Sequence, residues 1–360
     1  MKVAYRHLID CIESKPTVSE ISEKLFQLGH EHEIENDIFD MELTPNRGDC
    51  LSINGILRDL SVFYNINFNG RKLYEKEIQP LAIDFVNNAQ NECPHIAFLK
   101  IEIEEEILTY KGPLQEYFFT LKANKNNFFT DISNYISYET GQPTHCYDAT
   151  SLDQGISLKK LDGNFIFETL LDKEIKLTGK NLVFLSGEEI INLAGVVGGK
   201  STSCSKDTRT VIIECAYFNP EEIIGKSIRY GIQSEAAHKF ERNVDPMCHE
   251  KVLRRFLSIV DSHAVIKNVE LFKKTYIEHT NISIDFNLNA INKIIGTCIT
   301  ENEYKDYLLK LGFCISNNEI LVPSYRSDIN TQNDLAEEIA RSIGYNQIPI
   351  KEIKILNSLH

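Results

Sequence analysis

Residues 131–148, DISNYISYETGQPTHCYD, hold the densest group of chemically useful side chains in the sequence. Hydrogen-bonding groups at Asp131, Asn134, Gln142 and His145 stand close together, and buried polar groups are costly unless they are paired. The first part has the apolar spacing of a helix, which a Gly-Gln-Pro turn should end just before His145. A helix that ends in a turn and then presents a histidine can form the wall of a pocket. The alternative is a capped helix followed by a plain surface turn.

A single carboxylate interrupts the apolar run VIIECAYF, which otherwise has the pattern of a buried strand. We expect this carboxylate, Glu214, to face a cavity, although a place on the solvent face of the strand is the alternative. Upstream, Gly195 and the pair Gly198–Gly199 permit positive φ and a close approach of the backbone. Their spacing does not make a nucleotide loop, because Ala194 stands where the P-loop pattern needs glycine.

Four carboxylates gather where a helix is expected to begin near residue 334: Asp328, Asp334, Glu337 and Glu338. Spacings of three and four residues place the last three near one face of the first helical turn. Grouped oxygen ligands of this kind suit Mg²⁺. The alternative is a capping box formed by Asp334 and Glu337, since acidic residues also favour a helix N-terminus.

The elements that must position these groups indicate an α+β fold of several domains. We predict a small α/β unit over residues 1–70, a mixed-sheet unit over 71–275 and a helix-rich α/β unit over 278–350. In the first unit, Thr17 and Glu20 predict a capping box at a helix start. Further elements are expected as a helix through 53–64 and strands at 39–43, 96–105, 165–171, 181–187 and 210–218. Helical patterns cover 131–140, 220–228 and 248–261, and the third unit has the order strand (282–286), helix, helix, strand, helix.

The composition is that of a globular chain of 360 residues, 42% of them hydrophobic. A formal net charge of −14 argues against broad tracking of phosphates, although a local cleft can still bind one end of a nucleic acid. Nine cysteines without a C-x-x-C pair fit free thiols in a reducing compartment. The N-terminus lacks the apolar segment of a signal peptide, and no run is long and apolar enough to span a membrane. We therefore expect a cytoplasmic protein that does not contact membranes.

Long motifs distributed over most of the chain resemble one family, the β subunits of bacterial phenylalanyl-tRNA synthetase. They are TPNRGDCLSINGILRDL (44–60), LAGVVGG (193–199), IIECAYFNP (212–220), SIRYGIQSEAAHKFERNVDP (227–246) and VPSYRSDINTQNDLAEEIARSIGYNQIP (322–349). The resemblance implies an editing domain over 71–275, which hydrolyses mischarged tyrosyl-tRNA, and a winged-helix-like third unit. It also implies an α₂β₂ tetramer with an α subunit, which holds ATP and joins phenylalanine to its tRNA.

The resemblance further implies roles for individual residues. Ser133, Asn134 and His145 would be catalytic, by orienting a water and the ester carbonyl. Glu214 would recognise the tyrosine hydroxyl. The remaining substrate-binding positions would be Gly195, Ser234 and Ala236, and the magnesium ligands, shared with the α subunit, would be Asp328, Asp334, Glu337 and Glu338.

No convincing nucleophile accompanies these residues. Cys146 and Cys215 neighbour the expected site, but each is better interpreted as a small buried hydrophobe. We therefore expect hydrolysis by water, without a covalent intermediate.

Two departures from the family pattern matter. Residues 33–42 connect the first helix directly to the motif at 44–60, so the oligonucleotide-fold domain usually inserted there is absent. A Gly-x-Arg-Pro element usually precedes the 131–148 segment, but residues 123–127 contain neither Arg nor Pro. The cationic contact to the tRNA 3′ end is therefore either missing or taken over by Lys122 or Lys125. Two alternative functions remain open: a free-standing deacylase acting in trans, and a non-catalytic scaffold.

Overall fold

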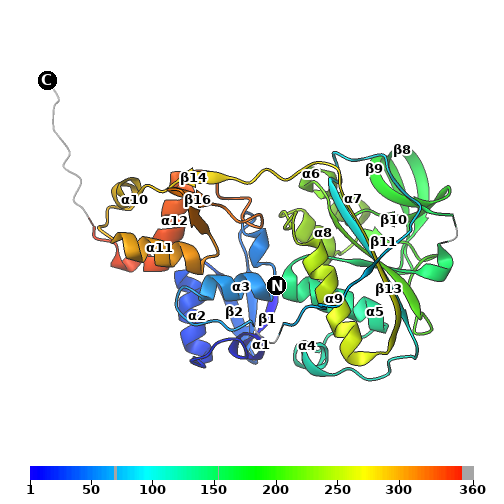
Figure 1. Cartoon of the computed structure of the whole chain (residues 1–360), viewed down its shortest axis with the longest axis horizontal. Helices are drawn as coiled ribbons and strands as arrows, with labels where there is room; N and C mark the ends of the chain where they lie inside the picture. The colour runs from blue at the N-terminus through cyan, green and yellow to red at the C-terminus, as the bar shows by residue number, and fades with distance from the viewer. Residues whose placement is uncertain (69–70, 153, 351–360) are drawn as a thin grey trace.

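A computed structural model describes residues 1–68, 71–152 and 154–350 (Figure 1). The chain forms two lobes that lie side by side. One contains the N-terminal residues, drawn in blue, together with the C-terminal helices, drawn in orange and red. The other contains the long middle part of the chain. The α+β class is confirmed.

The N-terminal unit is a three-stranded antiparallel sheet, in the order β1-β3-β2, packed against three helices. Its elements are β1 (Lys2–Ala4), α1 (Tyr5–Ile9), α2 (Val18–Gln27), β2 (Glu31–Glu35), β3 (Ile38–Glu42), a 3₁₀ turn η1 (Gly48–Cys50) and α3 (Ile53–Leu60). The capping box that begins α2 is confirmed: the backbone N–H of Glu20 donates to the Thr17 hydroxyl and that of Thr17 to the Glu20 carboxylate. The apolar residues of this unit pack into one cluster with α4, α5 and α9 of the middle unit, so the two units share a core.

The middle unit stacks two five-stranded sheets, with helices covering the outer face of the first. The first sheet has the order β4 (Gln79–Pro80), β13 (Ile266–Thr275), β6 (His95–Ile103), β12 (Thr210–Tyr217), β7 (His145–Asp148). The second has the order β11 (Val197–Gly198), β10 (Glu189–Leu193), β9 (Glu174–Ser186), β8 (Ile156–Glu168), β5 (Phe85–Asn87). The helices are α4 (Gly112–Leu121), α5 (Phe128–Thr140), α6 (Pro220–Ile223), α7 (Lys226–Tyr230), α8 (Glu235–Phe240) and α9 (His249–His263), with a 3₁₀ turn η2 (Ala149–Ser151).

Side chains along β12 point alternately to the two faces of the first sheet. Val211, Ile213 and Cys215 join the core beneath the helices, whereas Ile212 and Ala216 join the core between the two sheets. Glu214 therefore points into the layer between the sheets. One sequence expectation nearby was wrong: residues 220–228 form two short helices, because Gly225 adopts φ +76° between them.

The C-terminal unit contains β14 (Ser283–Asp285), α10 (Leu288–Ile295), α11 (Glu301–Lys310), β15 (Cys314–Ser316), β16 (Glu319–Leu321), α12 (Gln332–Ile343) and a 3₁₀ turn η3 (Tyr345–Gln347). Where one strand was expected after the two helices, a hairpin is present, because Asn317 and Asn318 both take positive φ in its two-residue turn. The expected cap of the last helix was also misplaced. Thr331 and Asp334 form the capping box, one turn earlier than the Asp334–Glu337 pair.

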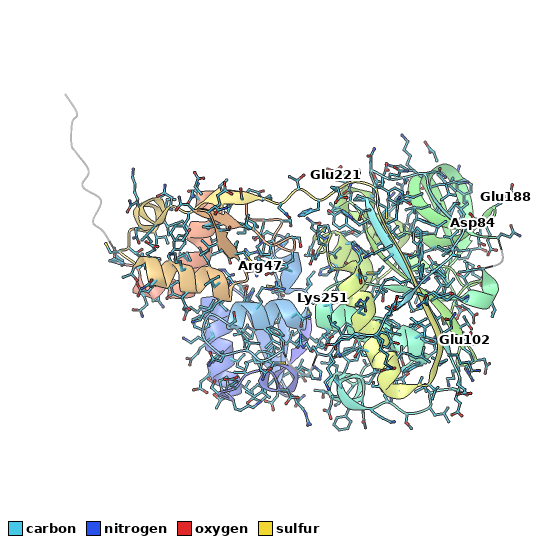
Figure 2. All side chains as sticks on the ribbon, in the orientation of Figure 1. Arg47, Asp84, Glu102, Glu188, Glu221 and Lys251 are labelled. Atoms are coloured by element: carbon cyan, nitrogen blue, oxygen red, sulfur yellow. The ribbon has the colours of Figure 1, made fainter. Side chains whose placement is uncertain are left out.

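A buried ion-pair network joins the N-terminal and C-terminal units, with Arg47 between them (Figure 2). Asp59 accepts hydrogen bonds from Arg47 at 2.9 and 3.0 Å, from Arg341 at 2.7 and 3.2 Å and from His30 at 2.7 Å. Burial alone would raise the pKa of Asp59, but Arg341 and Arg47 hold it well below its usual range. The carboxylate is thus a fixed charge that links two parts of the chain 282 residues apart.

Replacing Asp59 with alanine is expected to lower the free energy of unfolding by about 3–5 kcal/mol, because two buried guanidinium groups, of Arg47 and Arg341, each lose one of their carboxylate partners. Urea unfolding followed by circular dichroism measures this. Asp40→Ala is the matched control, since Asp40 is exposed and its pairing with the N-terminus at 3.7 Å is worth at most about 1 kcal/mol. Equal midpoints for the two variants would show that the network does not hold the units together.

Candidate editing site

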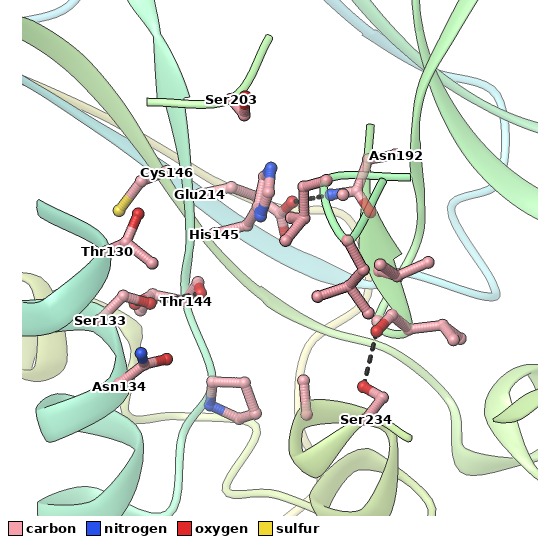
Figure 3. Close-up of a pocket in the computed structure, with 18 of the residues that line it drawn as sticks. Thr130, Ser133, Asn134, Thr144, His145, Cys146, Asn192, Ser203, Glu214 and Ser234 are labelled. Carbon is pink, nitrogen blue, oxygen red and sulfur yellow. Dashed lines mark hydrogen bonds between the residues drawn. The ribbon is translucent and has the colours of Figure 1, made fainter. Parts of the chain in front are cut away.

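A cavity of about 410 Å³ opens where the two sheets, α5 and α8 meet (Figure 3). It brings together all seven residues for which a role in hydrolysis or substrate binding was expected. They are Ser133, Asn134, His145, Gly195, Glu214, Ser234 and Ala236. Their segments are far apart in the sequence, and their roles stay predictions. Thr130, Thr144, Asn192 and Ser203 add further polar groups to the wall.

Strand pairing places the two most reactive side chains of this cavity next to each other. β12 pairs antiparallel with β7, and in that register Glu214 lies directly opposite His145. Directly paired residues project from the same face of a sheet. Both side chains therefore point into the layer between the sheets, where the cavity lies.

One oxygen of Glu214 is fixed by two neighbours. Oε2 accepts a hydrogen bond from the Tyr147 hydroxyl at 3.2 Å and from Asn192 Nδ2 at 3.3 Å, and Asn192 also donates to the Tyr147 oxygen at 2.9 Å. Among the described residues, no hydrogen bond reaches the other oxygen, Oε1. The side chain is only 4% exposed. Glu214 therefore offers one oriented, unpaired oxygen to a ligand in the cavity.

Burial raises the pKa of Glu214 to about 8, since only the Tyr147 hydroxyl opposes the cost of placing a charge there. At neutral pH the group is mainly a neutral carboxylic acid. A neutral acid can both accept and donate a hydrogen bond. It can thus pair with a hydroxyl without the desolvation cost of a buried charge.

This raised pKa makes the stability of the fold depend on pH. The folded state holds a proton on Glu214 that the unfolded chain, with an ordinary pKa near 4.5, has lost. The stabilisation is therefore complete below about pH 4.5 and is lost as pH rises through about 8. Glu214→Gln cannot ionise at this position. Relative to this variant, the free energy of unfolding of the wild-type protein should fall by about 3–5 kcal/mol between these two pH values.

Urea unfolding of both proteins at pH 5 and pH 8.5 tests that expectation. Glu188→Gln is the control, because Glu188 is exposed in a turn. The free energy of unfolding of this variant should differ from that of the wild-type protein by the same amount at both pH values. Parallel stability profiles for wild type and Glu214→Gln would mean that Glu214 titrates normally.

His145 presents a neutral imidazole to the cavity. Burial lowers its pKa to about 4, and its ring packs edge-on against Tyr147 with centroids 4.4 Å apart. Nε2 is shielded and has no hydrogen-bond partner among the described residues. A neutral imidazole with a free nitrogen can orient a water molecule or a substrate hydroxyl.

Gly198 is what allows His145 to occupy this position. A Cβ at residue 198 would lie 2.2 Å from Cε1 and 2.7 Å from Nε2 of the imidazole. No side chain fits there without displacing the ring.

Two of the expected site residues use their hydroxyl groups to build the cavity. Ser133 donates to the Thr144 carbonyl at 2.6 Å, which fixes the turn between α5 and β7. Ser234 donates to the Val196 carbonyl at 2.6 Å and caps α8 by accepting from the Ala237 N–H. In this structure both serines position the wall, whereas their direct contact with a substrate stays a prediction.

The side-chain amide of Asn134, by contrast, is available to form hydrogen bonds with a ligand. Its side chain is exposed on α5, and no hydrogen bond involves it among the described residues. Gly195 adopts φ +69°, and a Cβ there would lie 2.8 Å from the Ile223 side chain, so only glycine fits the turn beneath the cavity.

Asn192 and Tyr147 were not predicted from the sequence. Asn192 interrupts the apolar strand β10, EIINL, in the same way that Glu214 interrupts β12, so the same criterion would have found it. Tyr147 carried no such signal, because an aromatic residue in a buried strand is usually part of the core.

The rim near residues 123–127 is formed by amides. Asn126 and Asn127 line the cavity, whereas the Lys125 ammonium lies 4.5 Å from the Tyr110 ring centre, away from it. Asn127 caps α5 and donates to the Cys204 carbonyl at 3.0 Å. In the described chain neither Lys122 nor Lys125 lines the cavity, so they do not replace the missing arginine there.

The acidic quartet does not form a metal site as it stands. Both oxygens of Asp328 accept hydrogen bonds from Arg326, and Glu338 is bound by Arg326 and Arg341. One Asp334 oxygen is used by the helix cap. Within the described residues, the four do not bring their ligand oxygens within 4.8 Å of one another. As arranged here, these side chains do not fit a magnesium site, and the assignment of the four as magnesium ligands stays a prediction.

Comparison with known domain families gives two matches. Residues 106–265 match the B3/4 domain, and residues 284–345 match the tRNA synthetase B5 domain. The first match contains α5, β12 and the whole cavity wall, and the second contains the acidic quartet. In the described part of the chain, no helix is both long and apolar enough to cross a membrane.

Curated relatives carry the name phenylalanine–tRNA ligase β subunit. The protein from Legionella pneumophila (strain Lens) is 31% identical over 334 residues, which cover 88% of this chain and 41% of the relative. Those from Psychrobacter arcticus and Ehrlichia canis are each 29% identical, over 88% and 90% of this chain and 41% and 42% of the relatives. The chain thus spans about two fifths of the length of these relatives.

A solved structure shares the fold. It is an N-terminal fragment of the phenylalanyl-tRNA synthetase β subunit from Pyrococcus horikoshii, with a TM-score of 0.51 and 14% identity. The match covers 95% of this chain and 99% of that one.

Proposed function

Because this chain belongs to the family of phenylalanine–tRNA ligase β subunits and matches their N-terminal portion, we propose that its cavity hydrolyses tyrosine wrongly esterified to phenylalanine tRNA. The observation that carries the proposal is the buried Glu214, which is mainly neutral and keeps one oxygen unpaired in a cavity of about 410 Å³. That oxygen opens onto the cavity, where a ligand with a matching polar group can pair with it.

Selection of tyrosine follows from this arrangement. The phenolic hydroxyl of tyrosine pairs with Glu214 Oε1, while the ring lies among Phe218, Phe240 and Val196. Phenylalanine would leave the Glu214 oxygen unpaired. Sites that hydrogen-bond a substrate hydroxyl reject the analogue lacking it by about 10⁴–10⁵-fold.

Hydrolysis is assigned to a water molecule held by the part of the cavity wall that α5 and β7 form. Neutral His145, through an imidazole nitrogen, and the free amide of Asn134 orient this water toward the ester carbonyl carbon. The water oxygen bonds to that carbon, the bond from the carbon to the ribose oxygen breaks, and one water proton passes to the leaving ribose oxygen, which becomes the hydroxyl. The protein supplies orientation in this step and no covalent intermediate.

The cysteines support a mechanism in which water, and not a side chain of the protein, is the nucleophile. Burial raises the pKa of both the Cys146 and Cys215 thiols well above the ordinary value. The Cys146 thiol donates to the Phe129 carbonyl at 3.5 Å, and Cys215 belongs to the core beneath the helices. Neither is a reactive thiolate.

We further propose that this chain works with the α subunit of the ligase in an α₂β₂ tetramer. In that assembly the α subunit would bind ATP and magnesium and charge phenylalanine tRNA, and the chain described here would remove tyrosine.

Binding of non-hydrolysable analogues tests recognition separately from catalysis. Adenosine carrying tyrosine through a 3′-amide should bind the purified chain more tightly than the phenylalanine counterpart, by isothermal titration calorimetry. The preference should fall in Glu214→Ala and persist in Glu188→Ala. Equal affinity for the two analogues in the wild-type protein would refute the recognition role of the cavity.

A further inference from the structure

A second cavity, of about 350 Å³, lies where the N-terminal unit meets the middle unit. Helix α5 contributes to both cavities: Ser133 and Asn134 line the first, whereas Tyr135, Tyr138 and Glu139 line the second. The two cavities share no lining residue. The second is thus a separate site, and it does not depend on the function proposed for the first.

Three residues that line this second cavity each carry a buried polar atom that makes no hydrogen bond with the described residues. In the described chain, eleven buried side-chain polar atoms have no hydrogen-bond partner, and His7 Nε2, Arg71 Nη1 and Glu116 Oε2 are three of them. All three residues line this cavity. Glu116 Oε2 has an ionic partner in Arg6, whereas His7 Nε2 and Arg71 Nη1 have no polar partner among the described residues. Since buried polar atoms are nearly always paired in folded proteins, two such donors beside one cavity point to a missing polar ligand.

His7 offers a hydrogen-bond donor. The Tyr138 oxygen accepts from the Ala4 N–H at 3.4 Å and shares a second hydrogen bond with His7 Nδ1 at 2.9 Å. In the tautomer in which Tyr138 donates to Nδ1, the proton of the neutral imidazole sits on Nε2. The Glu116 backbone carbonyl lies near enough to raise the pKa of His7 slightly against the larger effect of burial, but without the geometry of a hydrogen bond.

Arg71 offers a second donor together with a poorly compensated positive charge. Its nearest carboxylate oxygen, on Glu139, is 3.8 Å away. Glu139 is already occupied by Arg255, at 2.6 and 2.8 Å, and by the Tyr135 hydroxyl at 2.6 Å. Among the described residues, Arg71 Nη2 donates to the Cys11 sulfur at 3.6 Å, and Nη1 makes no hydrogen bond.

Glu116 offers an acceptor on another side of the cavity. Its Oε2 lies 3.1 Å from Arg6 Nε, an ion pair at the surface, but it accepts no hydrogen bond from the described residues. The exposed carboxylate of Asp10 adds negative charge to the lining. Tyr135 and Pro113 provide apolar walls.

Two donors beside a positive charge, an acidic acceptor and apolar walls match one class of small molecule. We propose that this cavity binds a free α-amino acid with an apolar side chain. Its carboxylate accepts hydrogen bonds from Arg71 Nη1 and His7 Nε2, its ammonium group donates to Glu116, and its side chain packs against Tyr135 and Pro113. A cavity of this volume lies at the small end of the range for ligand sites.

Calorimetric titration of the full chain with L-phenylalanine and L-leucine tests the proposal. All titrations use the Asn134→Ala, Glu214→Ala background, so that binding in the first cavity does not contribute. Both amino acids should bind, and 3-phenylpropionate and phenethylamine, which each lack one charged group, should bind at least ~10-fold more weakly.

Arg71→Met keeps the apolar stem of the side chain and should weaken amino-acid binding at least ~10-fold. Arg229→Met, at an exposed arginine on α7, is the matched control and should change nothing. His7→Phe gives a second, independent loss if Arg71→Met fails to fold. The proposal is overturned by absence of binding up to ~10 mM ligand, by equal binding of 3-phenylpropionate, or by affinities that neither Arg71→Met nor His7→Phe changes.

Discussion

Replacing Glu214 with alanine is expected to lower the preference for tyrosine over phenylalanine in the deacylation reaction by about 10²-fold or more. The side chain is the buried polar group that a tyrosine hydroxyl would satisfy, and without it both ring types meet an apolar wall. The quantity to measure is the ratio of kcat/KM for tyrosine-charged and phenylalanine-charged tRNA. An unchanged ratio would remove Glu214 from recognition.

Glu214→Gln is the sharper comparison. Because burial raises the pKa of Glu214 to about 8, the wild-type group is mainly a neutral acid at pH 7, and glutamine resembles it in shape and in hydrogen bonding. This variant should keep most of the tyrosine preference at pH 7. If it loses as much as Glu214→Ala, the group acts as a carboxylate anion and its assignment as a neutral acid is wrong.

Replacing His145 with alanine is expected to slow hydrolysis itself, by about 10²-fold or more at saturating enzyme. The imidazole is neutral, lies opposite Glu214 in the sheet and has an unpaired nitrogen. Single-turnover release of tyrosine from tRNA measures the chemical step. His279→Ala, at a histidine outside this cavity, should retain the wild-type rate.

A change that leaves the imidazole in place but moves it provides an independent test. Gly198→Ala puts a methyl group into the position of the His145 ring, and should slow single-turnover hydrolysis in the same direction as His145→Ala. Wild-type rates in both variants would exclude His145 from the mechanism.

The sequence allowed the fold class, most strands and seven of the residues that line the first cavity to be predicted, some of these seven from local signals and the others from the family resemblance. Glu214 stood out because a carboxylate in an apolar strand must be either exposed or paired in a cavity. His145 stood out because it comes directly after a helix-ending turn. Both signals depend only on neighbouring residues in the sequence, so they can be recognised without knowledge of the tertiary structure.

The features that could not be predicted depend on long-range pairing. Glu214 accepts hydrogen bonds from Tyr147 and Asn192, which lie on strands of two different sheets. Only the strand register of the folded chain brings them together. The acidic quartet was expected to bind a metal because the spacing of its carboxylates can be read directly from the sequence. Its pairing with Arg326 and Arg341 cannot be read in that way, and neither arginine was given a role. The network through Asp59 spans 282 residues and has no local signature.

Selective hydrolysis of mischarged tRNA in the cavity that contains Glu214 and His145 is tested most directly by a single-turnover assay. The purified chain is mixed in excess with phenylalanine tRNA charged with tyrosine or with phenylalanine, with and without the α subunit. We expect release of tyrosine and sparing of phenylalanine, and loss of this release in His145→Ala. Equal release of both amino acids, or no release of tyrosine even with the α subunit present, would show that this cavity does not edit.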